Sequence, residues 1–135
     1  MSTESEKLRV LAVDDSPSVI AHFDQLVKSL EGVEVVGTAK DGVEALALLK
    51  TTSPDLVVMD IVMPRMDGLT ALRSMKQEYP DLRVAMLSSV AGSRSRAEEA
   101  FRLGAVQVLT KPFDATKLAA LFASERAVKV ERRGD

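Results

Sequence analysis

Five short apolar runs alternate with longer amphipathic stretches along the chain, and this alternation constrains the fold more than any other feature. The runs cover residues 8–13, 33–38, 56–59, 83–87 and 106–110. Within them, RVLAV, DLVVM and RVAML are almost continuously apolar, which is typical of strands buried on both faces of a parallel sheet. The stretches between the runs repeat apolar residues at helical spacing. These strand–helix units predict an α/β fold, a doubly wound parallel sheet with helices on both faces.

The length of 135 residues fits one compact domain. We expect a flexible N-terminus at residues 1–7, the domain at 8–124, and a charged C-terminal extension at 125–135 whose last residues, VKVERRGD, fray. The lack of cysteine excludes disulfides and thiolate chemistry, and a net charge of −2 gives no electrostatic reason to expect nucleic-acid or membrane binding. The opening MSTESEKL does not resemble a signal peptide, so we predict a cytoplasmic protein.

Side chains that can bind a metal or a phosphoryl group follow several predicted strands: Asp14 and Asp15, Asp60, Ser88 and Ser89, and Lys111. Ligands of doubly wound sheets bind outside the carboxyl ends of the strands, so we expect these side chains to meet there. Taken alone, an Asp-Asp pair is usually turn or helix-cap chemistry, and a lysine before proline is usually solvated. Their convergence on one edge of the sheet favours a functional site.

Carboxylates gathered at one edge repel one another, which requires a cation or raised pKa values. Oxygen ligands without cysteine or histidine favour a hard ion, and Mg²⁺ commonly uses one or two carboxylates together with water. A carboxylate can also act as a nucleophile and form an aspartyl phosphate. Lys111 can pair with phosphoryl oxygens, and Ser88 can donate a hydrogen bond to them. This set predicts Mg²⁺-dependent uptake of one phosphoryl group.

At these residues the chain resembles the receiver domains of bacterial two-component response regulators, in particular the single-domain chemotaxis regulators. The matching motifs are VLAVDDSPSV, PDLVVMDIVMPRMDGL, AMLSS and LGAVQVLTKPF, and the similarity runs from about residue 8 to residue 124. The resemblance implies a flavodoxin-like fold with five parallel strands in the order 2-1-3-4-5 and five helices. It also implies a signalling domain whose own chemistry is at most autodephosphorylation, not an enzyme.

The resemblance assigns roles to individual residues. Asp60 matches the aspartate that accepts the phosphoryl group, while Asp14 and Asp15 match the acidic pair that positions Mg²⁺, with Asp15 the more direct ligand. With Asp60 itself, the backbone carbonyl of Val62 is expected to complete the protein ligands.

Two further positions match the residues that sense the phosphoryl group. Ser88 matches the switch hydroxyl, provided that the fourth strand ends at Leu87; Ser89 is the alternative. Lys111 matches the lysine that contacts the phosphoryl oxygens, and the resemblance implies a cis bond between Lys111 and Pro112.

The chain departs from the family pattern at three positions. Val108 occupies the place where many receivers carry an aromatic residue that rotates inward, so we expect the signal to leave through the fourth helix or its leading loop. Val62 and Val90 occupy positions that often carry polar groups. We therefore expect slow autodephosphorylation, and a phosphorylated-state lifetime of seconds in the purified protein would contradict this.

Other polar residues receive plainer interpretations. His22 is predicted to face solvent on the first helix, although a phosphohistidine role is conceivable. Met63 and Met66 are interpreted as packing residues. Arg94 and Arg96 are interpreted as a solvated helix start that can also contact a partner.

We expect two kinds of partner: a sensor histidine kinase or phosphotransfer protein that supplies the phosphoryl group, and a target protein bound by the face of the fourth helix, fifth strand and fifth helix. No direct nucleic-acid or membrane contact is expected, and the chain is expected to be a monomer or a phosphorylation-dependent dimer.

The alternative is a receiver detached from a longer regulator, such as a chemotaxis methylesterase or a DNA-binding regulator. A phosphatase that works through an aspartyl phosphate is disfavoured, because haloacid-dehalogenase-like enzymes carry a DxD motif after the first strand, whereas the two acids are adjacent here, in DDS. A nucleotide binder is disfavoured because no glycine-rich loop that could bind phosphate follows the first strand.

Overall fold

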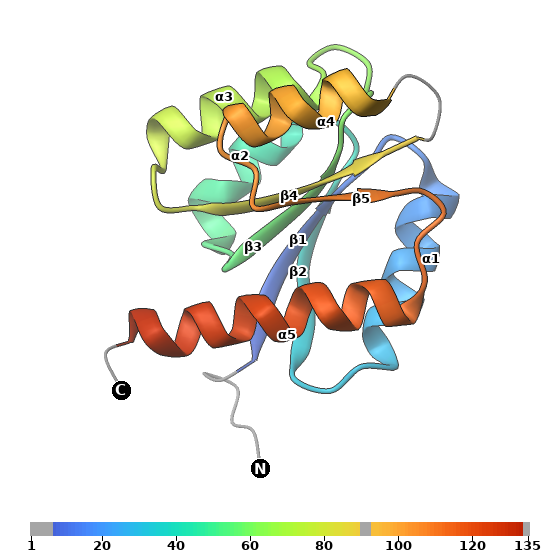
Figure 1. Cartoon of the computed structure of the whole chain (residues 1–135), viewed down its shortest axis with the longest axis vertical. Coiled ribbons are helices and arrows are strands. Elements are labelled where there is room, and N and C mark those ends of the chain that lie inside the picture. The colour runs from blue at the N-terminus through green and yellow to red at the C-terminus, as the bar shows by residue number, and fades with distance from the viewer. Residues whose placement is uncertain (1–6, 90–92, 134–135) are drawn as a thin grey trace.

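The computed structural model describes residues 7–89 and 93–133. Strands and helices alternate through these ranges, and the strands lie parallel (Figure 1). The strands are β1 (Leu8–Val13), β2 (Val33–Ala39), β3 (Leu56–Asp60), β4 (Arg83–Ser88) and β5 (Gln107–Thr110). The helices are α1 (Pro17–Lys28), α2 (Gly42–Thr52), α3 (Gly68–Glu78), α4 (Ser93–Arg102) and α5 (Ala115–Arg132).

The sheet of the described residues has the strand order β2-β1-β3-β4-β5, as predicted. In the sheet, β2 lies on one side of β1 and β3 lies on the other, so the strand order reverses at β1. The topological switch point is therefore at the carboxyl ends of β1 and β3. Strand ends agree with the sequence prediction to within one residue, because continuous apolar runs can be buried on both faces only in the sheet interior. Asp60 and Ser88 are the last residues of their strands.

Helices cover both faces of the sheet (Figure 1). On one face, Phe23 and Val27 of α1 pack with Leu118 and Phe122 of α5. On the other face, α2, α3 and α4 contribute a second cluster of buried residues that includes Leu49, Leu72, Met75 and Ala100. Both layers are therefore fixed by apolar packing, which leaves the ends of the strands free for polar residues.

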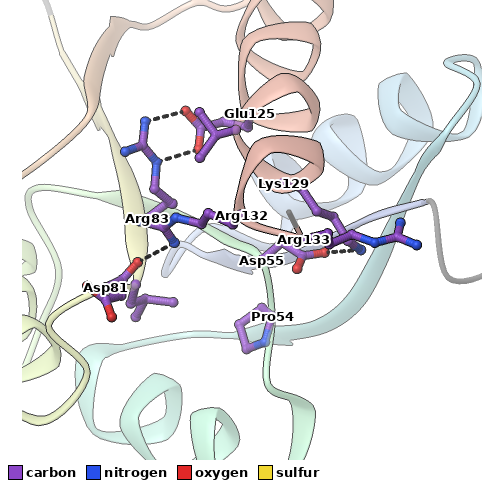
Figure 2. A pocket seen from close by; sticks show the side chains of 10 residues that line it. Pro54, Asp55, Asp81, Arg83, Glu125, Lys129, Arg132 and Arg133 are labelled. Carbon is purple, nitrogen blue, oxygen red and sulfur yellow. Dashed lines mark hydrogen bonds and ion pairs between the residues drawn. The ribbon is translucent and has the colours of Figure 1, made fainter. Parts of the chain in front are cut away.

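The C-terminal part of α5 differs from the prediction. The fraying expected of residues 128–135 is wrong as far as Arg132, where the helix ends, and residues 134–135 lie outside the described residues. Figure 2 shows why: Lys129 pairs with Asp55 at 2.9 Å and Arg132 donates to the Asp81 carbonyl at 2.7 Å. The predicted boundary after residue 124 therefore falls inside a continuous helix.

Candidate functional site

Asp14 shapes the turn that leads from β1 into α1. Its Oδ1 accepts a hydrogen bond from the Ser16 backbone N–H at 2.9 Å, and Ser16 in turn caps α1, with Pro17 at the first helical position. The turn role expected of an Asp at this position is therefore present. It occupies one carboxylate oxygen and leaves Oδ2 pointing to the site, where Lys111 contacts it.

Asp14, Asp15 and Asp60 come together at the carboxyl ends of β1 and β3. One carboxylate oxygen from each lies within 4.8 Å of the others. Asp14 and Asp60 are buried, with Asp60 only 8% exposed, whereas Asp15 is exposed to solvent. Clustered hard oxygen donors with one solvent-facing member fit a magnesium ion that retains water ligands.

Lys111 spans the two buried carboxylates. Its Nζ lies 2.9 Å from Asp14 Oδ2 and 3.2 Å from Asp60 Oδ2. The backbone places it there: Lys111 N–H donates to the Ser88 carbonyl at 2.7 Å, and the following bond to Pro112 is cis, as the sequence prediction had it.

The electrostatics of the cluster are unbalanced. Burial raises the pKa of Asp60 above its ordinary value, and the neighbouring Asp14 charge raises it further, while Lys111 opposes both. Burial by itself lowers the pKa of Lys111, but its hydrogen bond to Asp14 and the charges of Asp60 and Asp14 leave that pKa raised. The ammonium group is held charged, and the carboxylates still repel one another. An added cation would relieve that repulsion.

The loop after Asp60 passes very close to the strand. Gly68 N–H donates to the Ile61 carbonyl at 2.6 Å, and a Cβ at Gly68 would lie 2.2 Å from the Asp60 carbonyl oxygen. No other residue fits at position 68 without moving the backbone of Asp60 and Ile61. Val62 lies in this loop with its side chain 55% exposed. The metal-ligand role of its carbonyl stays a prediction.

Ser88 is buried at the end of β4, and Ser89 is exposed. The Ser88 hydroxyl donates to the Ser89 carbonyl at 3.1 Å. β4 ends at Ser88, one residue beyond the Leu87 end on which the assignment depended, and the strand buries Ser88 rather than Ser89. The switch role of the Ser88 hydroxyl stays a prediction. Val90 lies outside the described residues.

Several predicted positions lie away from the cluster. Val108 is half-buried and packs against the core on the α4 side. His22 is exposed, as expected, and its ring stacks on Phe113 with a centroid distance of 5.4 Å. Met63 is buried, in agreement with a packing role. Arg94 pairs with Glu98 at 3.7 Å on the exposed surface of α4.

The sequence interpretation missed an ion pair beside the site. Arg65, in the loop after Asp60, contacts Asp41, the N-cap of α2. The hydrogen bond from Glu44 N–H and then that from Arg65 hold the pKa of Asp41 below its ordinary value. A carboxylate three residues before a glutamate predicts a helix cap, so Asp41 could have been found from the sequence; its partner could not.

Among the described residues, no helix is both long and apolar enough to cross a lipid bilayer.

The model of the response regulator receiver domain matches residues 10–123. Over 118 residues, 42% are identical to chemotaxis protein CheY of Treponema pallidum, covering 86% of this chain and 81% of that protein. Over 105 residues, 41% are identical to protein-glutamate methylesterase/protein-glutamine glutaminase 5 of Myxococcus xanthus, covering 78% of this chain but 30% of that protein. The chain thus spans about a third of the methylesterase's length.

Solved structures agree with the observed topology. The response regulator domain of Thermotoga maritima CheB superimposes with a TM-score of 0.80 and 33% sequence identity, covering 90% of this chain and 97% of that chain.

Proposed function

The chain belongs to the response regulator receiver domain family, and from that premise we propose that it accepts a phosphoryl group on Asp60 in a Mg²⁺-dependent reaction. The observation that carries the proposal is the position of Lys111 Nζ, within 3.2 Å of both Asp14 and Asp60. The same ammonium group can contact an oxygen of a phosphoryl group on Asp60 without moving far. Asp14, Asp15, Asp60 and the Val62 carbonyl are the proposed metal ligands.

The proposed reaction transfers the phosphoryl group between two nucleophiles. An oxygen of the ionised Asp60 carboxylate forms a bond to phosphorus while the phosphorus–nitrogen bond of a phosphohistidine breaks, and the imidazole leaves with the electron pair. When bound, Mg²⁺ neutralises charge on the phosphoryl oxygens. Lys111 is the protein cation that contacts them, and the buried setting of Asp60 limits access of water to the acyl phosphate.

Phosphorylation is proposed to bias the Ser88 hydroxyl away from the Ser89 carbonyl and toward the phosphoryl oxygens. The Ser88 carbonyl accepts a hydrogen bond from the Lys111 N–H, and Lys111 directly follows β5. A shift at the end of β4 would therefore also move the end of β5. The proposed outcome is a changed affinity of the α4–β5–α5 face for a target protein. Phe101 is a 48% exposed aromatic residue of α4, which supports a binding role for this helix.

We also propose that the donor is a sensor histidine kinase or a phosphotransfer protein, that the protein acts in the cytoplasm, and that it performs no reaction beyond slow autodephosphorylation. A second proposal is that this sequence is the receiver part of a methylesterase, because the Myxococcus xanthus relative matches over only 30% of its own length. The first proposal predicts binding to a separate target protein, and the second predicts phosphorylation-dependent control of an attached catalytic domain.

The test is the intact mass of the purified chain after incubation with acetyl phosphate, with Mg²⁺ or with EDTA. We expect one adduct of about 80 Da on the wild type, lost in EDTA and lost in Asp60→Asn. Asp67→Asn is the matched control, because Asp67 caps α3 and asparagine caps a helix equally well. If the wild type forms no adduct and beryllofluoride does not perturb it either, the proposal fails.

A further inference from the structure

The loop that follows Asp60 is linked by an ion pair to the start of α2. The Arg65 guanidinium contacts the carboxylate of Asp41, whose side chain is 2% exposed, whereas the Arg65 side chain is 60% exposed. The other oxygen of Asp41 accepts the Glu44 backbone N–H at 2.9 Å and begins α2. Asp41 is therefore fixed by the helix that it caps, and Arg65 reaches inward from the loop to a rigid anchor.

The backbone at Arg65 has an unfavourable conformation. Its φ is +66°, in the left-handed region that residues with a Cβ seldom occupy, and Met66 N–H donates to the Pro64 carbonyl across it at 2.7 Å. A glycine would adopt this φ without strain. The arginine is thus held in a conformation that the local backbone does not favour, and its ion pair with Asp41 is a contact that offsets the cost.

Packing reinforces the same junction. A Cβ at Gly42, the residue after Asp41, would lie 3.0 Å from Met66 Sδ and 2.9 Å from the Cβ of Ala71. Glycine at this position therefore lets the loop and α3 approach the start of α2 closely. Two side chains of the loop thus contact the start of α2: Arg65 forms an ion pair with Asp41, and Met66 packs against Gly42.

We propose that Arg65 is a positioning residue for phosphoryl uptake, which anchors the acceptor loop to Asp41 and so fixes the backbone of Val62, whose carbonyl would hold the metal. This inference rests on the proposed function. The loop is closed at its base by the Gly68 N–H bond to the Ile61 carbonyl and is held at its tip by Arg65. Val62 lies between these two fixed points. Groups that orient metal ligands without touching the metal commonly affect affinity about tenfold or more.

The test separates anchoring from simple stabilisation. Arg65→Gly removes the ion pair but suits the left-handed backbone, so a merely conformational role predicts a variant at least as good as the wild type. Arg65→Lys keeps a cation. Arg73→Ala, at an exposed position on α3, is the matched control for loss of an arginine. Mg²⁺ affinity is measured by titration of backbone amide NMR shifts, and the thermal midpoint is measured alongside.

We expect Arg65→Gly to weaken Mg²⁺ binding about tenfold, Arg65→Lys to recover part of that loss, and Arg73→Ala to bind as the wild type does. Asp41→Asn keeps the helix cap, and combining it with Arg65→Gly should weaken Mg²⁺ no further, because both changes remove the same contact. The inference is overturned if Arg65→Gly binds Mg²⁺ within twofold of the wild type. If the wild type itself binds no Mg²⁺, the proposed function fails first, and the two failures are thereby distinguished.

Discussion

Charged side chains gather at both ends of the same sheet, and the two groups are organised differently. At the carboxyl ends of the strands, Asp14, Asp15 and Asp60 lie together and Lys111 contacts Asp14 and Asp60, so negative charge exceeds positive charge among these residues. At the amino ends, Glu125 and Asp55 each have a cation of their own. Arg83 holds Glu125 through two hydrogen bonds of 2.8 and 3.0 Å, and Lys129 holds Asp55 at 2.9 Å (Figure 2).

The difference distinguishes a candidate ligand-binding site at the carboxyl ends from structural ion pairs at the amino ends. The amino end has a cavity of about 260 Å³, but four of the ions that line it are already paired, Arg83 with Glu125 and Lys129 with Asp55. These two pairs attach α5 to the starts of β3 and β4. The carboxyl end keeps mutual repulsion between acids, seen in the raised pKa of Asp60, which burial and then Asp14 cause. Uncompensated charge, rather than the size of a cavity, marks where a ligand is needed.

The largest expected effect is at the amino end. Glu125→Leu leaves the Arg83 guanidinium without its carboxylate in a site where Glu125 is 4% exposed, and should lower the free energy of unfolding by about 3 kcal/mol. Urea titration measures this loss. The double change Arg83→Met with Glu125→Leu should recover most of it, because no unpaired charge remains. Phosphoryl uptake should be unchanged in both variants; a slower uptake would mean that the two ends are not independent.

A pair of matched lysine changes tests the comparison directly. Lys111→Met removes the cation beside Asp60 and should slow uptake from acetyl phosphate about a hundredfold, or about 2.7 kcal/mol in the barrier. Lys129→Met removes a cation from the amino end and should cost stability of about 1 kcal/mol with no change in uptake. Time-resolved intact mass gives the rates. Equal rates for the two variants would contradict a special role for Lys111.

Magnesium should act on one end alone. At ten times its dissociation constant, Mg²⁺ should raise the free energy of unfolding of the wild type by about 1.4 kcal/mol. Glu125→Leu should gain the same increment, since its change lies at the amino end. Asp15→Asn should gain less, because it loses the exposed oxygen ligand. An undiminished gain in Asp15→Asn would place the ion elsewhere.

The smallest expected effect is that of the Ser88 hydroxyl. Ser88→Ala removes one proposed hydrogen bond to the phosphoryl group and should slow uptake only about fivefold. The free energy of unfolding should change little, because in the unphosphorylated protein the hydroxyl bonds to the carbonyl of the next residue, Ser89. Ser89→Ala is the control and should leave the rate as it is. A larger loss in Ser89→Ala than in Ser88→Ala would reverse the assignment of the two serines.

The site was more predictable than the amino end, for a physical reason. Parallel strands bring their carboxyl ends to one edge, so Asp14, Asp60 and Lys111 could be brought together from the strand prediction alone. The partners of α5 offered no such rule. Asp55, Arg83 and Glu125 come from distant parts of the chain, and residues 128–135 were predicted to fray because the sequence does not show that Lys129 lies beside Asp55.

The sequence by itself determined the alternation of strands and helices along the chain and the strand ends to within one residue, because apolar runs and helix caps are local signals. Together with the family resemblance it also predicted the site residues Asp14, Asp15, Asp60, Ser88 and Lys111, whose roles remain to be tested. Only the tertiary structure decided which charges neutralise one another: Arg65 with Asp41, Arg83 with Glu125, and Lys111 shared between two acids. Charge pairing acts over a few ångströms in space, and residues far apart in the chain acquire that proximity only when the helices pack onto the sheet.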